Sequence, residues 1–270
     1  MADNIVTDEV RYDSPSGGLN AYLAQPAEGG PFPALVVIHE FTGMIPYVQD
    51  VTRRFAREGY LALAPDLYSN DPVRPTLTME DMEDGAEIVR EPDPEAALHH
   101  FPAERREAIK RAIEWRANRD GKMWVPDLLA AVDYLKARPD VVEDAVGSIG
   151  FCLGGRMSGT MAAYGADLAA CVIFYGPVPP LDKVPNIKCP VQGHYGGADH
   201  TGCTDKVPQL AEAMKANGKS FEYFIYEGAP HAFHNDTRNS YTPDVAKKSW
   251  DTALKFLDQN VKSKAKAAAV

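Results

Sequence analysis

One cysteine stands between glycines where the sequence changes from a strand-like to a helix-like pattern. In Val146-Gly-Ser-Ile-Gly-Phe-Cys-Leu-Gly-Gly155 an apolar run reaches Gly150, and Cys152 and Gly154 follow it. Glycines two residues either side of a nucleophile relieve the crowding of a sharp strand-to-helix turn. Such a turn points the side chain at the N-terminus of the next helix, where the dipole favours a thiolate or an oxyanion. We therefore predict a nucleophile at Cys152, although this string alone also fits a tight turn beside a buried cysteine.

Two more polar residues follow strand-like segments further along the chain. Asp199 comes shortly after Val191–Tyr195, and His231 comes shortly after Phe221–Tyr226. A histidine that takes the thiol proton and an acid that orients its imidazole would complete a catalytic triad with the cysteine. The order nucleophile, acid, histidine is typical of α/β-hydrolases, whereas other triad enzymes use different orders. The sequence therefore predicts the triad Cys152, Asp199 and His231.

Several segments resemble the dienelactone hydrolase family. They are Gly-Phe-Cys-Leu-Gly-Gly around Cys152, Gly-Ala-Asp at Asp199, His-Ala-Phe at His231, Val36-Val-Ile-His-Glu-Phe-Thr-Gly43 and Gly59-Tyr-Leu-Ala-Leu-Ala-Pro-Asp-Leu-Tyr68. The likeness runs from about Ala21 to Leu257 and is weakest between Ser69 and Lys122. It implies an α/β-hydrolase fold and hydrolysis of an ester or lactone by a cysteine nucleophile. The motifs are specific for the family as a whole and do not identify the substrate.

Further roles are expected beside the triad. The backbone N–H groups of Leu153 and Phe41 are expected to form the oxyanion hole. The resemblance places Glu40 near the nucleophile, where a carboxylate opposes thiolate formation by like-charge repulsion unless it takes the proton itself. We expect Glu40 to restrain the thiol until substrate arrives. The alternative is a surface glutamate at a strand end.

The residues after His231 depart from the family pattern. Family members that act on dienelactone have an arginine that helps to hold the substrate carboxylate, and this chain has Asn235 at that position. His234 and Arg238 are the nearby candidates for substrate binding. A second substrate arginine would fall in the weakly matching insert, where the candidates are Arg74, Arg105 and Arg106. This departure bears on the dienelactone substrate and leaves ester or lactone chemistry in place.

The strand and helix patterns alternate along most of the chain. Expected strands are Glu9–Ser14, Leu19–Gln25, Ala34–His39, Tyr60–Ala64, Val146–Phe151, Leu168–Tyr175, Val191–Tyr195 and Phe221–Tyr226; expected helices are Tyr47–Glu58, Val125–Lys136, Gly155–Tyr164, Thr204–Asn217 and Pro243–Val261. The first two strands read as an antiparallel pair. The alternation predicts an α/β fold, with a mostly parallel central sheet and helices on both faces.

One long segment interrupts this alternation. Residues 69–122 contain five prolines, an acidic run Glu80–Glu87 and a helical run Glu104–Arg119. We expect a helical cap over the nucleophile, and the alternative is a solvated excursion at the sheet edge. The Lys/Ala-rich tail 262–270 is expected to fray. Residues 1–270 are therefore expected to form a single α/β-hydrolase domain with this insert.

Composition limits the classes of partner and the cellular compartment that we expect. A chain of 270 residues with 45% hydrophobic content can bury a large core. A net charge of −10 with dispersed basic residues argues against nucleic acid and anionic membranes, so the expected partner is a small molecule. The start Met-Ala-Asp-Asn lacks the features of a secretory signal, no stretch has the length and apolar character of a membrane span, and the four cysteines lack framework spacing. We expect a reduced, cytoplasmic protein.

The sequence thus predicts a cysteine-dependent hydrolase of a carboxylic ester or lactone that passes through a thioester. A thioesterase or acyl-transfer enzyme on the same fold is the first alternative. A catalytically weak binding or thiol-sensing protein on the same scaffold is the second. No cofactor is expected. His194, Asp199, His200 and Cys203 lie close together in the sequence, but their spacing matches no zinc pattern, so we predict no metal.

Overall fold

The computed structural model describes residues 4–119 and 121–268. The chain divides into two compact units, one formed by Met1–Leu67 with Trp124–Val270 and the other by Tyr68–Met123. The start Met-Ala-Asp, residue 120 of the insert and the last two residues of the tail, on which some predictions fall, lie outside the described residues.

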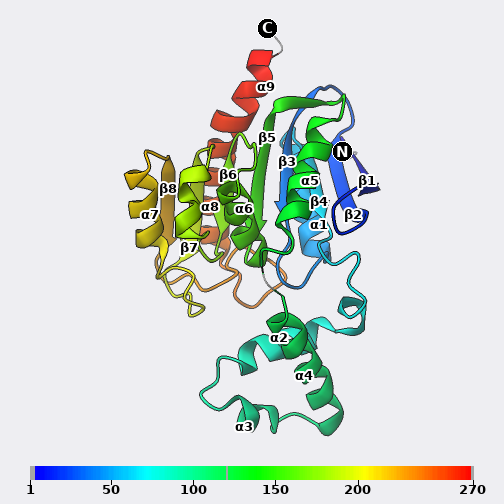
Figure 1. Ribbon diagram of the computed structural model, residues 1–270, viewed down its shortest axis with the longest axis vertical. Helices are drawn as coiled ribbons and strands as arrows, with labels where there is room; N and C mark the ends of the chain where they lie inside the picture. Colours follow the sequence, from blue (N-terminus) through cyan, green and yellow to red (C-terminus); the bar gives the residue numbers. More distant parts are fainter. Residues whose placement is uncertain (1–3, 120, 269–270) are drawn as a thin grey trace. The chain divides into compact units, whose positions relative to one another are not determined.

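An eight-stranded sheet forms the centre of the larger unit (Figure 1). Its strands are β1 (Ile5–Tyr12), β2 (Leu19–Pro26), β3 (Phe32–Ile38), β4 (Leu61–Pro65), β5 (Val141–Phe151), β6 (Cys171–Phe174), β7 (Val191–Gly196) and β8 (Phe221–Tyr226). The order across the sheet is β1-β2-β4-β3-β5-β6-β7-β8. β2 pairs antiparallel with β1 and with β4, and the remaining neighbours pair in parallel. The predicted mostly parallel sheet is confirmed.

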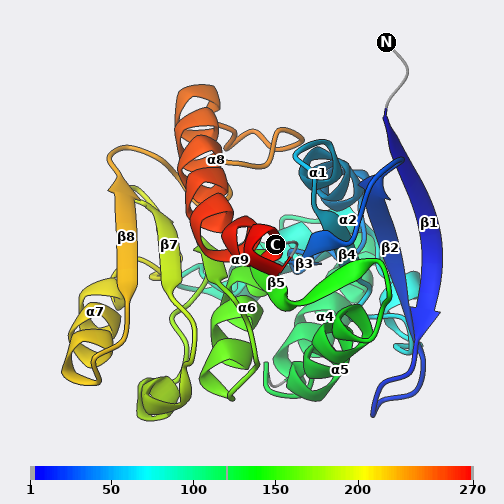
Figure 2. The ribbon, with the colours of Figure 1, turned by 90° about the horizontal axis from the view of Figure 1, so that it is seen from above.

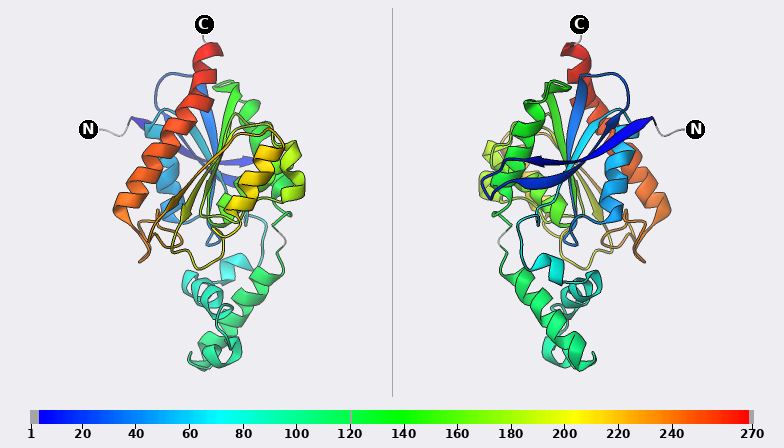
Figure 3. Two further views of the ribbon diagram at one scale, coloured as in Figure 1. Left: turned by 90° about the vertical axis from the view of Figure 1, so that its left-hand side faces the viewer. Right: turned by 90° about the vertical axis from the view of Figure 1, so that its right-hand side faces the viewer.

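Helices cover both faces of this sheet. α1 (Pro46–Arg57) and α8 (Pro243–Leu257) lie on one face, and α5 (Val125–Lys136), α6 (Leu153–Ala163) and α7 (Val207–Ala216) lie on the other (Figures 2 and 3). A short 3₁₀ segment, η2 (Leu181–Asn186), precedes β7. The chain leaves α8 through the π-helical segment η3 (Asp258–Lys262) and enters α9 (Ser263–Ala268). Residues 263–268 of the tail that we expected to fray are therefore helical.

The register of the parallel strands brings several strand ends to one edge of the sheet. Every residue of β3 and β4 is buried, as expected for strands covered on both faces. Ile38 at the end of β3 lies opposite Gly150 of β5, and Phe151 lies opposite Phe174 of β6. Phe174 in turn lies opposite His194 of β7. Loops that follow these strands therefore emerge side by side, which is where open α/β sheets hold their ligands.

The second unit is small and helical. It contains η1 (Arg74–Thr76), α2 (Met79–Ile88), α3 (Pro94–Leu98) and α4 (Ala103–Ala117). Ile88, Leu98 and Ile109 form its core, one from each of the three α-helices. Arg105 donates hydrogen bonds to three carboxylates of α2: Glu80, Asp81 and Asp84. The segment that we expected to form a helical cap thus contains helices, and its role as a cap stays a prediction.

The helices within the described ranges include none with the length and apolar character that crossing a bilayer requires.

Candidate active site

Cys152 forms the turn between β5 and α6. Its backbone has φ 54° and ψ −112°, and α6 begins at the next residue rather than at the predicted Gly155. A side chain on Gly150 would place its Cβ 2.0 Å from the carbonyl oxygen of Gly154, and one on Gly154 would come equally close to that of Ile38. Only glycine fits at these two positions, because no real Cβ contact is so short. Cys152 is partly exposed, whereas the other three cysteines are buried.

Backbone strain is concentrated around this turn. Within the described residues three non-glycine residues have positive φ: Cys152 at 54°, Tyr175 at 38° and Ala232 at 59°. Tyr175 directly follows β6, and Ala232 directly follows His231. Each such conformation costs on the order of 1–3 kcal/mol and persists where the surrounding structure enforces it. Strain of this kind tends to cluster at functional sites, and here it marks three neighbouring loops.

His231 and Asp199 are hydrogen-bonded to each other. The Nδ1 of His231 lies 2.8 Å from Oδ2 of Asp199. Oδ1 of Asp199 accepts from the backbone N–H of Thr201 at 2.8 Å and from its hydroxyl at 2.6 Å. The Asp199 side chain is fully buried, and that of His231 is 22% exposed. The charge of the Cys152 sulfur also acts on His231, so the two groups are neighbours. The structure thus brings together the three residues that the sequence predicted as a triad.

Electrostatics favour a protonated imidazole at this position. Burial lowers the pKa of His231, but the charge and hydrogen bond of Cys152 and the Asp199 carboxylate raise it, and the net pKa is about 10. Burial raises the pKa of Asp199, but the hydrogen bonds from His231 and Thr201 outweigh it, so the pKa is lowered. An imidazole that holds a proton beside a thiol is the arrangement that stabilises a thiolate.

Glu40 is buried beside the same strand ends. It lies two residues after the end of β3 and is 1% exposed, so it is not a surface glutamate. Its Oε1 accepts from the Tyr175 hydroxyl at 3.3 Å. Its Oε2 accepts from Nδ2 of Asn235 at 2.9 Å and from Nε of Arg238 at 3.3 Å. The residue at the family's arginine position, Asn235, therefore contacts Glu40, and so does Arg238, one of the two predicted substrate ligands.

The loop that carries Glu40 and Phe41 is fixed by His39. The backbone N–H of Leu67 donates to Nε2 of His39 at 3.1 Å, so the ring proton must lie on Nδ1. The Nδ1–H group of His39 donates to the carbonyl oxygen of Glu40 at 2.6 Å. Opposite this loop, Leu153 opens α6, and the first N–H groups of a helix have no partner within it. The two residues predicted for the oxyanion hole thus stand on a restrained loop and at a helix N-terminus.

His234 was predicted to bind substrate, and the structure buries it instead. It is 2% exposed, and its Nδ1 lies 2.7 Å from the hydroxyl of Tyr47. Its ring stacks on Trp250 with centroids 5.6 Å apart and lies 5.3 Å from Phe151. The left-handed turn at Ala232 directs the following residues into the core, so closeness to His231 in sequence does not place His234 in the site.

Sequence reasoning missed both tyrosines of this region. Tyr175 ends a continuous apolar run, and we interpreted it only as the end of a buried strand, yet its ring lies 5.2 Å from that of His231. We interpreted Tyr47 only as the start of an amphipathic helix. The signal that could have found Tyr175 is a polar aromatic residue at the carboxyl end of a strand next to the nucleophile strand.

One group of possible metal ligands overlaps the triad. Ligand atoms of Asp199, Cys203 and His231 all lie within 4.8 Å of one another. The Thr201 hydroxyl lies 2.6 Å from Asp199 and 3.0 Å from the Cys203 sulfur. His194 bonds instead to Tyr226 and Gln192. Two members of this group, Asp199 and His231, are therefore hydrogen-bonded to each other, and Thr201 links Asp199 to Cys203.

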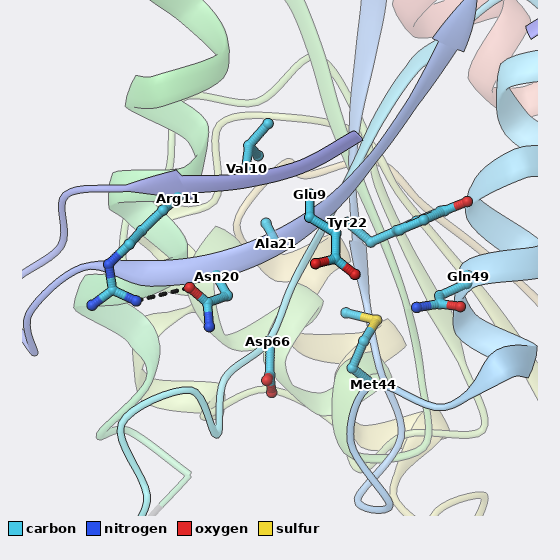
Figure 4. A pocket seen from close by; sticks show the side chains of 9 residues that line it. All are labelled: Glu9, Val10, Arg11, Asn20, Ala21, Tyr22, Met44, Gln49 and Asp66. Carbon is cyan, nitrogen blue, oxygen red and sulfur yellow. Dashed lines mark hydrogen bonds between the residues drawn. The ribbon is translucent and has the colours of Figure 1, made fainter. Parts of the chain in front are cut away.

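A separate hollow lies against the N-terminal hairpin. It has a volume of about 370 Å³ and is lined by Glu9, Val10, Arg11, Asn20, Ala21, Tyr22, Met44, Gln49 and Asp66 (Figure 4). Arg11 donates to Asn20 across one of its sides at 2.8 Å. The residues that line this hollow do not include Cys152, Asp199, His231 or Glu40, so the hollow is separate from the candidate active site.

Comparisons with known proteins identify the family of this chain. Residues 19–261 match the model of the dienelactone hydrolase family. A protein from Methylorubrum extorquens, provisionally named a carboxymethylenebutenolidase, is 32% identical over 92% of this chain and 79% of its own. A protein from Bradyrhizobium, provisionally named a 2-oxo-3-(5-oxofuran-2-ylidene)propanoate lactonase, is 31% identical over 88% of each chain.

Solved structures show the same relationship. The crystal structure of a provisionally named dienelactone hydrolase from Klebsiella pneumoniae is similar to this chain with a TM-score of 0.73 and 28% identity, over 94% of this chain and 99% of the other. The fold, the match over most of the sequence and these relatives lead to one conclusion: the chain belongs to the dienelactone hydrolase family, a family of hydrolases.

Proposed function

We propose that this member of the family hydrolyses a carboxylic ester or lactone with Cys152 as the nucleophile. The observation that carries the proposal is the hydrogen-bonded Asp199–His231 pair, which neighbours a cysteine at a strained strand-to-helix turn. Family membership supports ester or lactone hydrolysis, and the geometry supports the cysteine mechanism. A thioesterase or acyl-transfer activity would use the same groups and is the alternative that the experiment must separate.

In the first half of the reaction the sulfur, whose proton is held on Nε2 of His231, attacks the acyl carbon. The carbonyl oxygen becomes an oxyanion, which the N–H groups of Leu153 and Phe41 would stabilise by about 3 kcal/mol each. The tetrahedral intermediate collapses when the carbon–oxygen bond to the leaving group breaks. The leaving oxygen takes the proton from His231, and a thioester on Cys152 remains.

In the second half water cleaves the thioester. Once the sulfur is acylated it carries no charge, so its contribution to the raised pKa of His231 disappears. With a lower pKa the imidazole stays unprotonated near neutral pH and can accept a proton from water, and Asp199 stabilises the cation that forms. Water adds to the acyl carbon, His231 returns its proton to the departing sulfur, and the carboxylic acid leaves. The enzyme ends in its starting protonation state.

Glu40 is proposed to restrain the thiol before substrate binds. Its carboxylate is buried and accepts hydrogen bonds from Tyr175, Asn235 and Arg238. A buried negative charge near a sulfur disfavours the thiolate. The Arg238 side chain is 21% exposed and pairs with Glu40, and it remains the candidate that binds a substrate carboxylate. The relatives named as a carboxymethylenebutenolidase and a lactonase favour a lactone substrate that carries a carboxylate.

Burst kinetics with p-nitrophenyl acetate test the mechanism. A cysteine hydrolase releases p-nitrophenol in a burst equal to the enzyme concentration, followed by steady turnover. An acyl-transfer enzyme shows the burst but turns over only when a thiol or amine acceptor is added. A thiol-sensing protein is acylated once and stops. Parallel assays on lactones with and without a carboxylate then define the substrate class.

Two expectations remain proposals. A thiol nucleophile requires reducing conditions, so we expect the protein to act in the cytoplasm. The role of residues 69–122 as a cap likewise stays a prediction.

A further inference from the structure

Thr201 contacts both partners of the Asp199–His231 pair. Its backbone N–H donates to Oδ1 of Asp199 at 2.8 Å, and its hydroxyl donates to the same oxygen at 2.6 Å. The other carboxylate oxygen, Oδ2, accepts from Nδ1 of His231 at 2.8 Å. The Thr201 hydroxyl oxygen also lies 3.4 Å from that ring nitrogen. One threonine therefore touches the acid and the base that the proposed mechanism uses.

The hydroxyl proton of Thr201 has two candidate acceptors. Oδ1 of Asp199 lies 2.6 Å from the hydroxyl oxygen, and the sulfur of Cys203 lies 3.0 Å from it. Burial raises the pKa of Asp199, but its hydrogen bonds with His231 and Thr201 lower it overall, so the carboxylate is charged at neutral pH. A charged oxygen is a stronger acceptor than a thiol sulfur, which accepts only weakly. The Thr201 hydroxyl therefore donates to Asp199.

A backbone hydrogen bond holds the loop of Asp199 against the loop of His231. The N–H of Ala198 donates to the carbonyl oxygen of Ala229 at 2.9 Å. This bond fixes where the two loops lie, but it does not fix the rotation of the carboxylate about its Cβ–Cγ bond, a torsion with a broad preference. The Asp199 side chain is fully buried, so bulk water does not hold it either. The groups that hold its two oxygens are Thr201 on one side and His231 on the other.

We propose that Thr201 is a positioning residue for the triad. Its hydroxyl sets the plane of the Asp199 carboxylate, and the carboxylate in turn sets the direction of the His231 ring. Because His231 acts in both acylation and deacylation, the hydroxyl of Thr201 serves both halves of the reaction. Thr201 acts through Asp199 and not on the substrate itself. The inference rests on the proposed roles of Cys152, Asp199 and His231.

The same loop offers a matched control. Thr204 is half-buried, as Thr201 is, and its hydroxyl donates to the backbone carbonyl oxygen of Gly196 at 2.8 Å. Thr204→Val and Thr201→Val each remove one hydroxyl from this loop and keep the shape of the side chain. The acceptor that loses its donor is a neutral carbonyl in the first variant and the Asp199 carboxylate in the second. Destabilisation of the loop is thus common to both variants, and loss of positioning is confined to Thr201→Val.

The experiment is rapid-mixing kinetics with p-nitrophenyl acetate, which gives the burst rate, the burst amplitude and the steady rate of each variant. Thr201→Val should lower the burst rate and the steady rate together by about 10-fold, the scale of one hydrogen bond to a charged group. Its burst amplitude should equal that of the wild type, because the folded fraction is unchanged. Thr201→Ser, which keeps the hydroxyl, should recover both rates to within about 2-fold. Thr204→Val should stay within about 2-fold of the wild type.

A double variant tests whether Thr201 acts through Asp199. In an Asp199→Ala background Thr201→Val should lower neither rate further, because the carboxylate that Thr201 positions is absent. An undiminished loss in that background would overturn the inference. Should Asp199→Ala fail to fold, the comparison of Thr201→Val with Thr201→Ser and Thr204→Val still decides the question.

Two other results would also count against Thr201. Equal effects of Thr201→Val and Thr204→Val would overturn the inference, and so would a Thr201→Val variant that loses burst amplitude while both rates hold, because that is the mark of a purely structural role. Turnover by Cys152→Ala would instead overturn the proposed function itself, so the two failures are distinguishable.

Discussion

Two carboxylates are buried at this site, and their surroundings differ. The side chain of Asp199 is fully buried and bonds to the imidazole of His231, a partner that gains and loses a proton in the reaction. Glu40 is 1% exposed and bonds to Tyr175, Asn235 and Arg238, whose protonation states stay fixed at neutral pH.

In the proposed mechanism these two like charges have opposite roles. We propose that Asp199 stabilises the cation on His231 and so favours a proton on the imidazole. Glu40 has no partner that gains and loses a proton, and we propose that it restrains the nucleophile before substrate binds.

The largest effect should come from removing the sulfur on which both carboxylates act. Cys152→Ala should lower ester turnover by about 10⁴-fold or more, because no other group can form the acyl-enzyme. Replacement of Cys171, Cys189 or Cys203 by alanine should leave turnover in place. Burial raises the pKa of the Cys171 thiol to about 11, so it should also resist alkylation. Full activity in Cys152→Ala would remove the basis of the comparison.

Neutralising Asp199 should have the next largest effect. Asp199→Asn keeps the size of the side chain but removes the charge that stabilises the imidazolium, so kcat should fall by about 10²- to 10⁴-fold. Steady-state kinetics on p-nitrophenyl acetate measure it, with Asp205→Asn on the same loop as the control. A loss smaller than that of Glu40→Gln would reverse the roles that we assign to the two carboxylates.

Neutralising Glu40 should have a smaller effect of a different kind. If Glu40 restrains the thiol, Glu40→Gln should alkylate faster at neutral pH while turnover falls, by about 10-fold in each case, because like-charge repulsion is lost. If Glu40 accepts the thiol proton, the same variant should alkylate more slowly. Unchanged alkylation and turnover would make Glu40 a bystander.

The smallest effect concerns stability and pH. The pKa of His231 in the folded protein is about 10, above its ordinary value of 6.5, so protonation of this residue favours the folded state. Its contribution is complete below pH 6.5 and is lost as the pH rises toward 10. Urea unfolding of the wild type and of His231→Gln should therefore show a stability difference that shrinks across this window. A difference that grows with pH would contradict the assignment.

The sequence predicted what local pattern determines. Cys152, Asp199 and His231 each stand in a short motif after a strand, and the strand–helix alternation predicts the parallel sheet. The position of β4 between β2 and β3 depends on tertiary pairing and was not predicted.

The surroundings of Glu40 could not be predicted for a related reason. Glu40 and Tyr175 are separated by more than a hundred residues, and only the folded sheet brings the hydroxyl to the carboxylate. His234 was misassigned because three residues of separation from His231 say nothing about direction after the left-handed turn at Ala232.

The most direct test is the mass of the enzyme during turnover. The protein is mixed with p-nitrophenyl acetate, quenched in acid within the burst phase, and digested for mass spectrometry. The account predicts one acetyl group on the peptide that contains Cys152, removed by hydroxylamine at neutral pH as a thioester is. An acetyl group on a serine, or turnover with no adduct at Cys152, would contradict it.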